Sequence, residues 1–249
     1  MAKENYCEKI KTRLKAIEAL KTLKQTHSYS ELSKKTGVPT TVLNRYIKGH
    51  LLPSYLRARK ILSMFQYSEE TITGEDIKKL IAAHVKFDKN GFFNNTQIVT
   101  NTVLLRSIGA YIKEKYNSLK IDKILTAAVD GIPLATHVAS NFNVPVIFGK
   151  YSKEIGVDAF YEAVSSIEAS GIVTTMYLPK NLLLKGEAVL IVDDVIRSGE
   201  TQKMLVSITE EASAKLLGII VLLGIGEKWR NSIKLDSDAF IEVLYQLKE

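Results

Sequence analysis

Two adjacent carboxylates follow a run of branched apolar residues in the C-terminal half of the chain. Residues 189–201 read Val-Leu-Ile-Val-Asp-Asp-Val-Ile-Arg-Ser-Gly-Glu-Thr. The four residues before the acids suit a strand buried on both faces of a parallel sheet, and such sheets bind ligands at the carboxyl ends of their strands. Asp193 and Asp194 would then accept hydrogen bonds from ligand hydroxyls. The pattern predicts a site for a polyol.

The loop after the acid pair is suited to phosphate. It consists of Arg197, Ser198, Gly199, Glu200 and Thr201, and it leads into a helix predicted over Gln202–Ala212. Small residues let backbone N–H groups turn toward one point, and free amides at a helix start favour a phosphate dianion. The alternative is a strand-to-helix turn with Asp as the helix cap, which explains one acid but not two. The segment therefore predicts a cradle for a sugar phosphate.

This segment resembles the 5-phosphoribosyl-1-pyrophosphate (PRPP) motif of the type I phosphoribosyltransferases. By that resemblance, Asp193 and Asp194 hold the ribose hydroxyls and residues 197–201 hold the 5-phosphate. Arg197 departs from the enzymes, which usually carry a small residue or an Asp there, whereas the bacterial purine repressor, a non-enzymatic relative, carries a basic residue. The departure argues against catalysis and not against phosphate binding, so no catalytic residue is assigned.

Two further segments would serve a pyrophosphate group. Asp130 and Gly131 follow a strand predicted over Ile121–Val129, and Gly131 to Ala135 resembles the pyrophosphate loop of orotate enzymes. Lys150 and Lys153 stand where the family often supplies pyrophosphate-binding cations. An ordinary strand-helix joint and two solvated lysines are the alternatives. The resemblance implies Mg²⁺ together with PRPP, because Mg²⁺ bridges pyrophosphate oxygens with few protein ligands, and no residue is assigned to the metal.

Lys228 and Trp229 resemble the hood of purine phosphoribosyltransferases, where a Lys meets the base oxygen and an aromatic ring stacks on the base. A hydrophobic lid residue is the alternative for Trp229, because packing and stacking both need a flat ring. The predicted loop 154–171 contains Glu154, Asp158, Glu162 and Glu168 but no Lys, Arg or His. An acidic loop repels pyrophosphate and argues against orotate chemistry, although Tyr161-Glu162 keeps a purine enzyme open.

The positive charge of the chain lies at its N-terminal end. Residues 1–60 hold 14 of the 34 Lys and Arg and 4 of the 27 Asp and Glu, a net charge of +10. The remaining 20 basic and 23 acidic residues leave −3 for the rest. This asymmetry indicates a polyanion-binding module joined to a near-neutral domain.

The basic module has the pattern of a helix-turn-helix. Ser28 or Ser30 can cap a first helix, Gly37 allows a tight turn, and Pro39 fits the first turn of a second helix. With Leu32, Val38, Leu43 and Tyr46 inward, the second helix turns outward Thr40, Thr41, Asn44, Arg45 and Lys48. These side chains can contact base edges and phosphates. The alternative is a small helical bundle with solvated charges.

The whole chain predicts two domains: a small all-α helix-turn-helix domain over 1–66 and, after a linker at 67–74, an α/β domain with a parallel sheet over 75–249. Further helices are predicted over Tyr6–Leu23, Glu75–Lys86, Gln97–Lys115 and Pro133–Asn141, strands over Val144–Phe148, Ala188–Val192 and Lys215–Leu223, and a turn-rich link over Phe87–Asn95. The lone Cys7 and the absence of a long apolar run predict a soluble cytoplasmic protein without membrane contact.

The order of modules resembles the archaeal orotate phosphoribosyltransferase-like transcription regulators and is similar in plan to the bacterial purine repressor. The resemblance implies a DNA-binding regulator, acting as a homodimer on promoter DNA, whose phosphoribosyltransferase-like domain senses PRPP or a purine nucleotide. A catalytically active purine or orotate phosphoribosyltransferase is the alternative.

Overall fold

The computed structural model describes residues 6–24, 27–64, 73–89, 93–165 and 173–248. The chain forms two compact units, Met1–Thr71 and Ile72–Glu249. The predicted linker at 67–74 lies mostly outside the described residues, and Gly74 at its end is already the first residue of a helix. Within the described part of the chain, no helix is long and apolar enough to cross a bilayer.

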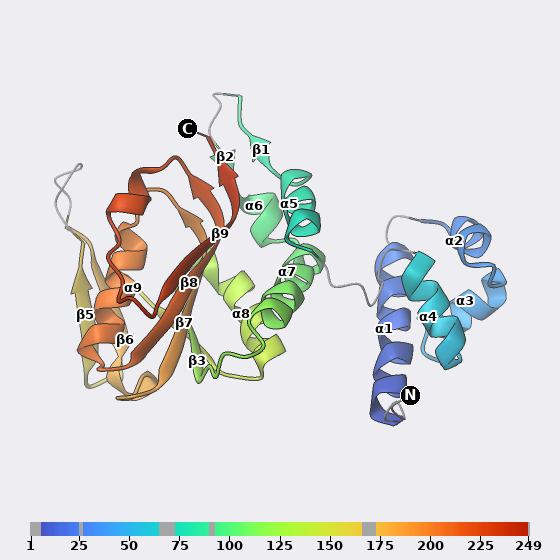
Figure 1. Cartoon of the computed structure of the whole chain (residues 1–249), viewed down its shortest axis with the longest axis horizontal. Coiled ribbons are helices and arrows are strands. Elements are labelled where there is room, and N and C mark those ends of the chain that lie inside the picture. Colours follow the sequence, from blue (N-terminus) through green and yellow to red (C-terminus); the bar gives the residue numbers. More distant parts are fainter. Residues whose placement is uncertain (1–5, 25–26, 65–72, 90–92, 166–172, 249) are drawn as a thin grey trace. The chain divides into compact units, whose positions relative to one another are not determined.

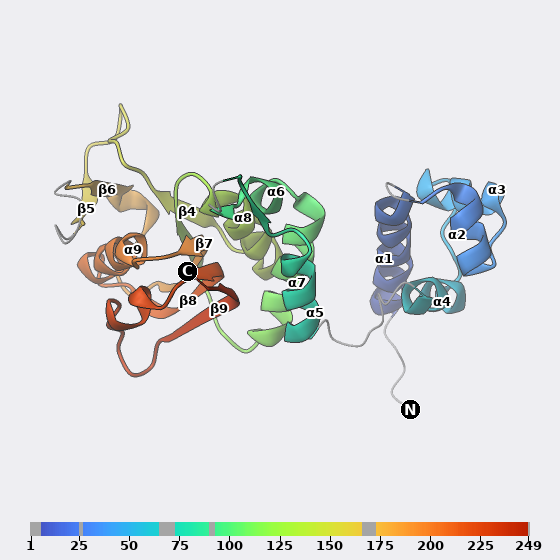
Figure 2. The ribbon, with the colours of Figure 1, turned by 90° about the horizontal axis from the view of Figure 1, so that it is seen from above.

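The first unit is a bundle of short helices around one small core. It contains α1 (Tyr6–Lys24), α2 (Tyr29–Thr36), α3 (Thr40–Ile47) and α4 (Tyr55–Met64), and Figure 2 shows α4 beside α1. The four residues expected inside, Leu32, Val38, Leu43 and Tyr46, are all buried. They pack with Ala16, Ile17, Ala19, Leu20, Ala58, Ile61 and Leu62 from α1 and α4.

The turn between α2 and α3 follows from local sequence. The Ser28 hydroxyl accepts a hydrogen bond from the Glu31 amide at 3.2 Å, and the Glu31 carboxylate accepts one from the Ser28 amide at 2.7 Å. This reciprocal capping starts α2. Gly37 ends α2 with a φ of 67°, a left-handed conformation that glycine adopts without a steric cost. Pro39 immediately precedes α3, one position earlier than predicted.

The second unit is an α/β domain. Its helices are α5 (Gly74–Ala82), α6 (Thr96–Val99), α7 (Thr102–Lys115), α8 (Gly131–Phe142) and α9 (Glu200–Glu211). Its strands are β1 (Lys86–Phe87), β2 (Phe93–Asn94), β3 (Lys123–Ala127), β4 (Val146–Gly149), β5 (Phe160–Val164), β6 (Thr175–Pro179), β7 (Ala188–Ile196), β8 (Lys215–Ile225) and β9 (Phe240–Leu247).

Within the described residues, the central sheet has five strands in the order β4-β3-β7-β8-β9, and every pairing is parallel. Figure 1 shows α7 and α8 on one face of this sheet and α9 on the other. Leu190 and Val192 of β7 pack toward the first face, whereas Val189 and Ile191 pack toward the second. The predicted parallel α/β domain, with β7 buried on both faces, is confirmed.

Four sequence predictions of elements need correction. The helix predicted over Glu75–Lys86 ends at Ala82, and Lys86 is the first residue of β1. The helix predicted over Gln97–Lys115 is two helices, because the Asn101 side chain accepts a hydrogen bond from the Leu104 amide at 3.1 Å and starts α7 anew. The predicted turn-rich link Phe87–Asn95 contains the antiparallel pair β1–β2. The strand predicted to end at Val192 continues to Ile196, because β8 pairs with it that far.

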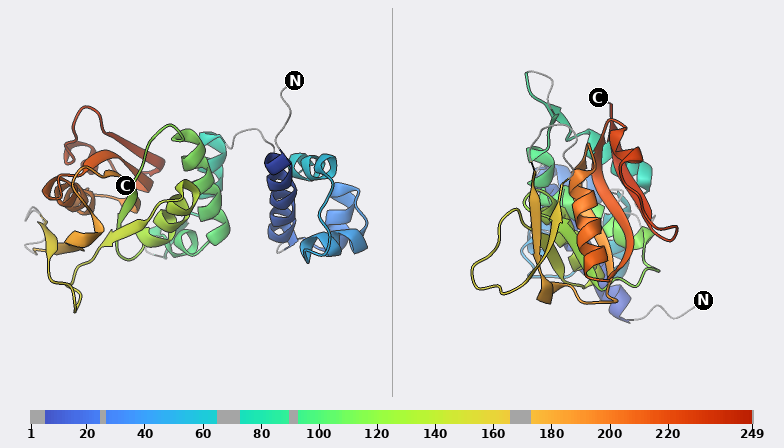
Figure 3. Two further views of the ribbon diagram at one scale, coloured as in Figure 1. Left: turned by 90° about the horizontal axis from the view of Figure 1, so that it is seen from below. Right: turned by 90° about the vertical axis from the view of Figure 1, so that its left-hand side faces the viewer.

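Part of the predicted acidic loop is regular structure. β5 and β6 form an antiparallel ribbon that lies against α9, as Figure 3 shows. Neither strand was predicted, and β9, which completes the sheet, was also missed. Glu162 belongs to β5, whereas Glu168 lies outside the described residues.

Candidate functional site

The acid pair lies where β7 loses one of its two neighbours. Pairing with β3 ends at Ile191, whereas pairing with β8 continues to Ile196. Asp193 and Asp194 therefore stand inside β7 but beyond the end of its pairing with β3. Asp193 is only 3% exposed, and its carboxylate accepts hydrogen bonds from Gln202 Nε2 at 2.7 Å and from the Asp194 amide at 3.1 Å. The strand thus holds the pair at the carboxyl edge of the sheet.

Burial and neighbouring negative charges make both carboxyls costly to ionise. Burial, followed by the charge of Asp194, raises the pKa of Asp193 well above its ordinary value. Burial also raises the pKa of Asp194, and Asp130 adds to the increase while the hydrogen bond from Asn95 opposes it. A bound ligand that donates hydroxyl hydrogen bonds would stabilise the charged forms.

Asn95 joins the acid pair from a distant part of the sequence. Its Nδ2 donates to Asp194 Oδ2 at 2.7 Å and to Asp130 Oδ2 at 3.2 Å. Asp130, which precedes α8, was predicted to lie near the acid pair, and this shared amide brings the two acids together. Asn95 itself was not predicted, and neither was Gln202, which lies in α9 and fixes Asp193. Only the polar doublet before a helix start could have indicated Asn95.

Gly131 lies against the acid pair. A Cβ atom at this position would overlap Thr126 Oγ1 and Asp193 Oδ1. The Thr126 side chain is fully buried, and its hydroxyl has no hydrogen-bond partner in the described structure. Only glycine leaves room for α8 to begin this close to β7. The predicted loop residues Asp130 and Gly131 are therefore next to the predicted ribose site.

The loop between β7 and α9 is shaped by contacts from the chain's C-terminal part. Gly199 has a φ of 87°, and a Cβ there would lie 2.6 Å from Ser232 Oγ. The Ser232 hydroxyl donates to the Ser198 carbonyl at 2.7 Å, a contact that was not predicted. Arg197 and Ser198 are exposed, and Glu200 and Thr201 form the first turn of α9. The loop ends at a helix N-terminus, as the phosphate cradle requires.

The two predicted pyrophosphate lysines already have acidic partners. Lys150, which directly follows β4, forms an ion pair with Glu154. Lys153 Nζ lies 2.6 Å from Glu162 Oε1 and 5.0 Å from the centre of the Tyr177 ring. The Glu162 interaction raises the pKa of Lys153, so the ammonium stays charged. Both cations are near the strand end but are engaged by carboxylates.

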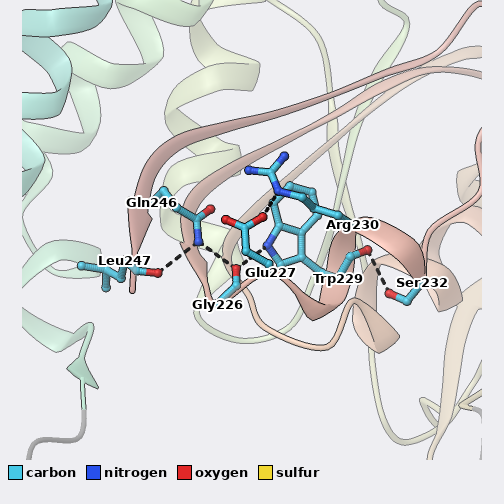
Figure 4. Close-up of polar contacts among 7 residues, drawn as sticks. All are labelled: Gly226, Glu227, Trp229, Arg230, Ser232, Gln246 and Leu247. Carbon is cyan, nitrogen blue, oxygen red and sulfur yellow. Dashed lines mark hydrogen bonds and ion pairs between the residues drawn. The ribbon is translucent and has the colours of Figure 1, made fainter. Parts of the chain in front are cut away.

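The Trp229 side chain is buried and is not exposed for stacking on a base. It lies in a short 3-10 helix, Lys228–Asn231, is 4% exposed, and donates from Nε1 to the Gly226 carbonyl at 3.1 Å. Figure 4 shows this contact together with Arg230, whose guanidinium carbon lies 4.5 Å from the ring centre. This geometry favours the lid interpretation over base stacking. Lys228, by contrast, is exposed next to it.

The predicted DNA-contacting residues share one surface of α3. Thr40, Thr41, Arg45 and Lys48 are exposed. Asn44 is half-buried, and its Oδ1 accepts a hydrogen bond from the Tyr29 hydroxyl at 3.1 Å. The first unit therefore presents hydroxyl, amide and cationic groups from α3 and from Lys48, the residue that follows it.

Comparison with known proteins identifies both units. The phosphoribosyl transferase domain family matches residues 94–246, and a helix-turn-helix family matches residues 17–72. The chain therefore belongs to the phosphoribosyltransferase domain family and carries an N-terminal helix-turn-helix. The adenine phosphoribosyltransferase of Thermoanaerobacter pseudethanolicus has the same fold as the second unit, with a TM-score of 0.58 and 17% identity over 70% of this chain and 100% of that one.

Similar sequences include both enzymes and regulators. The xanthine phosphoribosyltransferase of Alkaliphilus metalliredigens is 35% identical over 56% of this chain and 72% of its own length. That of Clostridioides difficile is 30% identical over 70% of this chain and 90% of its own. A probable purine biosynthesis transcriptional regulator of Streptococcus pneumoniae is 29% identical over 59% of this chain, which spans about half (54%) of the regulator.

Proposed function

We propose that the chain is a DNA-binding transcription regulator whose phosphoribosyltransferase-like domain senses PRPP or a purine nucleotide. The observation that carries the proposal is the union, in one chain, of a basic helix-turn-helix with a sugar-phosphate cradle. Residues 1–60 carry a net charge of +10, and the exposed face of α3 supplies groups for phosphates and base edges. The similarity to a probable purine biosynthesis regulator supports the same hypothesis.

The effector would occupy the edge formed by β7 and α8. Its ribose hydroxyls would donate to Asp193 and Asp194, and at Asp194 they would replace the hydrogen bond from the Asn95 amide. Its 5-phosphate would lie at residues 197–201, where Arg197 adds a positive charge and the start of α9 adds free amides. Lys228, which is exposed, would contact the base, and Asp130 and Gly131 would line the remaining side.

Mg²⁺ would accompany PRPP rather than a nucleoside monophosphate. Among the described residues, no group of three or more His, Cys, Asp or Glu side chains is placed to hold a metal ion. Asp130 and Asp194 nevertheless offer carboxylate oxygens, which Mg²⁺ prefers, and the diphosphate of PRPP would supply others. These residues therefore fit a metal that arrives with its ligand.

Promoter binding would involve two copies of the chain. Helix-turn-helix proteins usually read two half-sites with a two-fold symmetric dimer. The proposed control of purine genes follows the purine-related relatives. The more specific resemblance to archaeal orotate phosphoribosyltransferase-like regulators stays a prediction, because the relatives compared above are bacterial.

A purine phosphoribosyltransferase is the second candidate, and the similarity to xanthine phosphoribosyltransferases favours it. Arg197 and the acidic partners of Lys150 and Lys153 count against turnover, because catalysis requires groups that stabilise the leaving pyrophosphate. An orotate phosphoribosyltransferase fits less well than a purine enzyme, because the acidic segment after β4 would repel the leaving pyrophosphate.

One pair of assays on the full chain separates the two candidates. Binding to a duplex from the chain's own promoter region is compared with binding to a random duplex at two salt concentrations. In parallel, the protein is incubated with PRPP, Mg²⁺ and each purine base, including xanthine, and nucleotide formation is followed. We expect a promoter preference without appreciable turnover. Rapid nucleotide formation with no promoter preference would identify an enzyme instead.

A further inference from the structure

The exposed face of α3 contains one side chain whose orientation is fixed by another helix. Thr40, Thr41, Arg45 and Lys48 are exposed, but Asn44 is half-buried against α2. The Tyr29 hydroxyl, in the first residue of α2, donates to Asn44 Oδ1 at 3.1 Å. The Nζ of Lys24 lies 5.0 Å from the centre of the Tyr29 ring and helps to hold that ring in place.

This contact changes what Asn44 can offer to a ligand. An asparagine amide has an acceptor oxygen and two N–H donors. The Tyr29 hydroxyl occupies one of the two lone pairs of this oxygen and turns the oxygen toward α2, so the Nδ2 donors are the part of the amide presented to a partner. No hydrogen bond from Asn44 Nδ2 to another side chain is found among the described residues of this unit.

We infer that Tyr29 is a specificity-determining residue, which positions Asn44 as a hydrogen-bond donor toward base edges in the major groove. The inference rests on the proposed DNA-binding function and deepens it. An asparagine with both ends free pairs with adenine through N6 and N7. An amide whose oxygen is held toward α2 presents its Nδ2 side and can donate to any base edge with an acceptor, such as N7 of adenine or of guanine. The wild-type protein is therefore expected to bind adenine and guanine equally well at the base pair that Asn44 contacts.

The test is selection of binding sites from a randomised duplex library by the full chain. Wild type, Asn44→Ala and Tyr29→Phe are compared, with Tyr6→Phe as the matched control, because Tyr6 is an exposed tyrosine of the same unit. Asn44→Ala locates the base pair that Asn44 reads, since preference is lost there. Tyr29→Phe keeps the ring but releases the amide oxygen.

We expect Tyr29→Phe to favour adenine over guanine at that base pair by roughly fivefold or more, the lower end of the discrimination of a good bidentate pair. Other positions, the salt dependence of binding and the circular dichroism spectrum should match wild type, so a merely structural role would not produce this pattern. Equal purine preference in Tyr29→Phe and wild type overturns the inference alone. Absence of any selected site in wild type removes the proposed function and the inference with it.

Discussion

β7 and β4 end at the same edge of one parallel sheet, yet, among the residues that the structure describes, only at β4 do the charged side chains already have partners of opposite charge. At β7, Asp193 and Asp194 are held by amide donors, and no ion pair to either is found among the described residues. At β4, Lys150 and Lys153 are already neutralised by Glu154 and Glu162. A site keeps its charges unpaired where a ligand must supply the partner. From this difference we propose that the sheet edge binds the phosphoribosyl part of a ligand more than a pyrophosphate.

The largest expected effect comes from removing the charges at β7. The double variant Asp193→Asn with Asp194→Asn should lose PRPP and nucleotide binding in calorimetric titration, because each lost charged hydrogen bond costs roughly 1.5 to 3 kcal/mol. Asp236→Asn, at an exposed position, serves as the control. Unchanged affinity in the double variant would remove the site assignment.

The same double variant should stay folded and gain stability. Burial raises the folded-state pKa of both acids above the unfolded value, so their ionisation costs stability as the pH rises through that window. Neutral amides avoid this cost, so we expect the free energy of unfolding at neutral pH to be higher than in wild type. Urea unfolding measures it. A marked loss of stability would mean that the charges are structural.

Gly131→Ala tests whether the close approach of α8 to β7 shapes the β7 site, the ligand site formed by Asp193 and Asp194. The added methyl group must displace Thr126 or Asp193, both buried. Overpacking of this kind costs roughly 1 to 3 kcal/mol of stability, and we expect nucleotide affinity to fall with it. Thr136→Ala, on an exposed position of α8, is the comparison variant. Wild-type affinity in Gly131→Ala would show that the loop and the acid pair act separately.

Asn95→Ala should shift the pH dependence of ligand binding. Ribose hydroxyls need ionised carboxylates, so affinity falls as the pH drops through the raised pKa of Asp194. The Asn95 hydrogen bond lowers that pKa, and its removal should move the midpoint to higher pH. Affinity is measured across pH for wild type, Asn95→Ala and the neighbouring variant Asn94→Ala. A midpoint that stays in place or moves to lower pH is incompatible with this role.

The smallest effect is expected at β4. Lys150→Gln and Lys153→Gln should change nucleoside monophosphate affinity by no more than about threefold, since exposed ion pairs contribute roughly 0 to 1 kcal/mol. PRPP is titrated in parallel. A loss above tenfold for PRPP alone would show that these lysines exchange their glutamates for pyrophosphate. The two strand ends would then bind different parts of the same ligand.

Local patterns predicted the parts of this molecule that depend on local physics. The branched run before Asp193 gave a strand buried on both faces, and Ser28, Gly37 and Leu43 gave the helix-turn-helix geometry. Two of the missed residues act across long separations, whereas Gln202 lies only nine positions from Asp193. Asn95 is 99 positions from Asp194, and Ser232 is 34 from Ser198, so no periodicity or spacing connects them. For Trp229 the sequence left base stacking and lid packing open, because a lone aromatic residue does not reveal which of its faces is covered.

The central claim is that ligand occupancy of the β7 site controls DNA binding by the helix-turn-helix. Its most direct test is a titration of promoter duplex with the full chain, with and without saturating PRPP or purine nucleotide, for wild type and the double Asp193→Asn, Asp194→Asn variant. We predict that one of these ligands shifts wild-type DNA affinity by roughly 5- to 150-fold, the usual range of coupling between two sites, and leaves the variant unchanged. Equal wild-type affinity with and without every ligand, at concentrations where calorimetry shows the site to be filled, would contradict the claim.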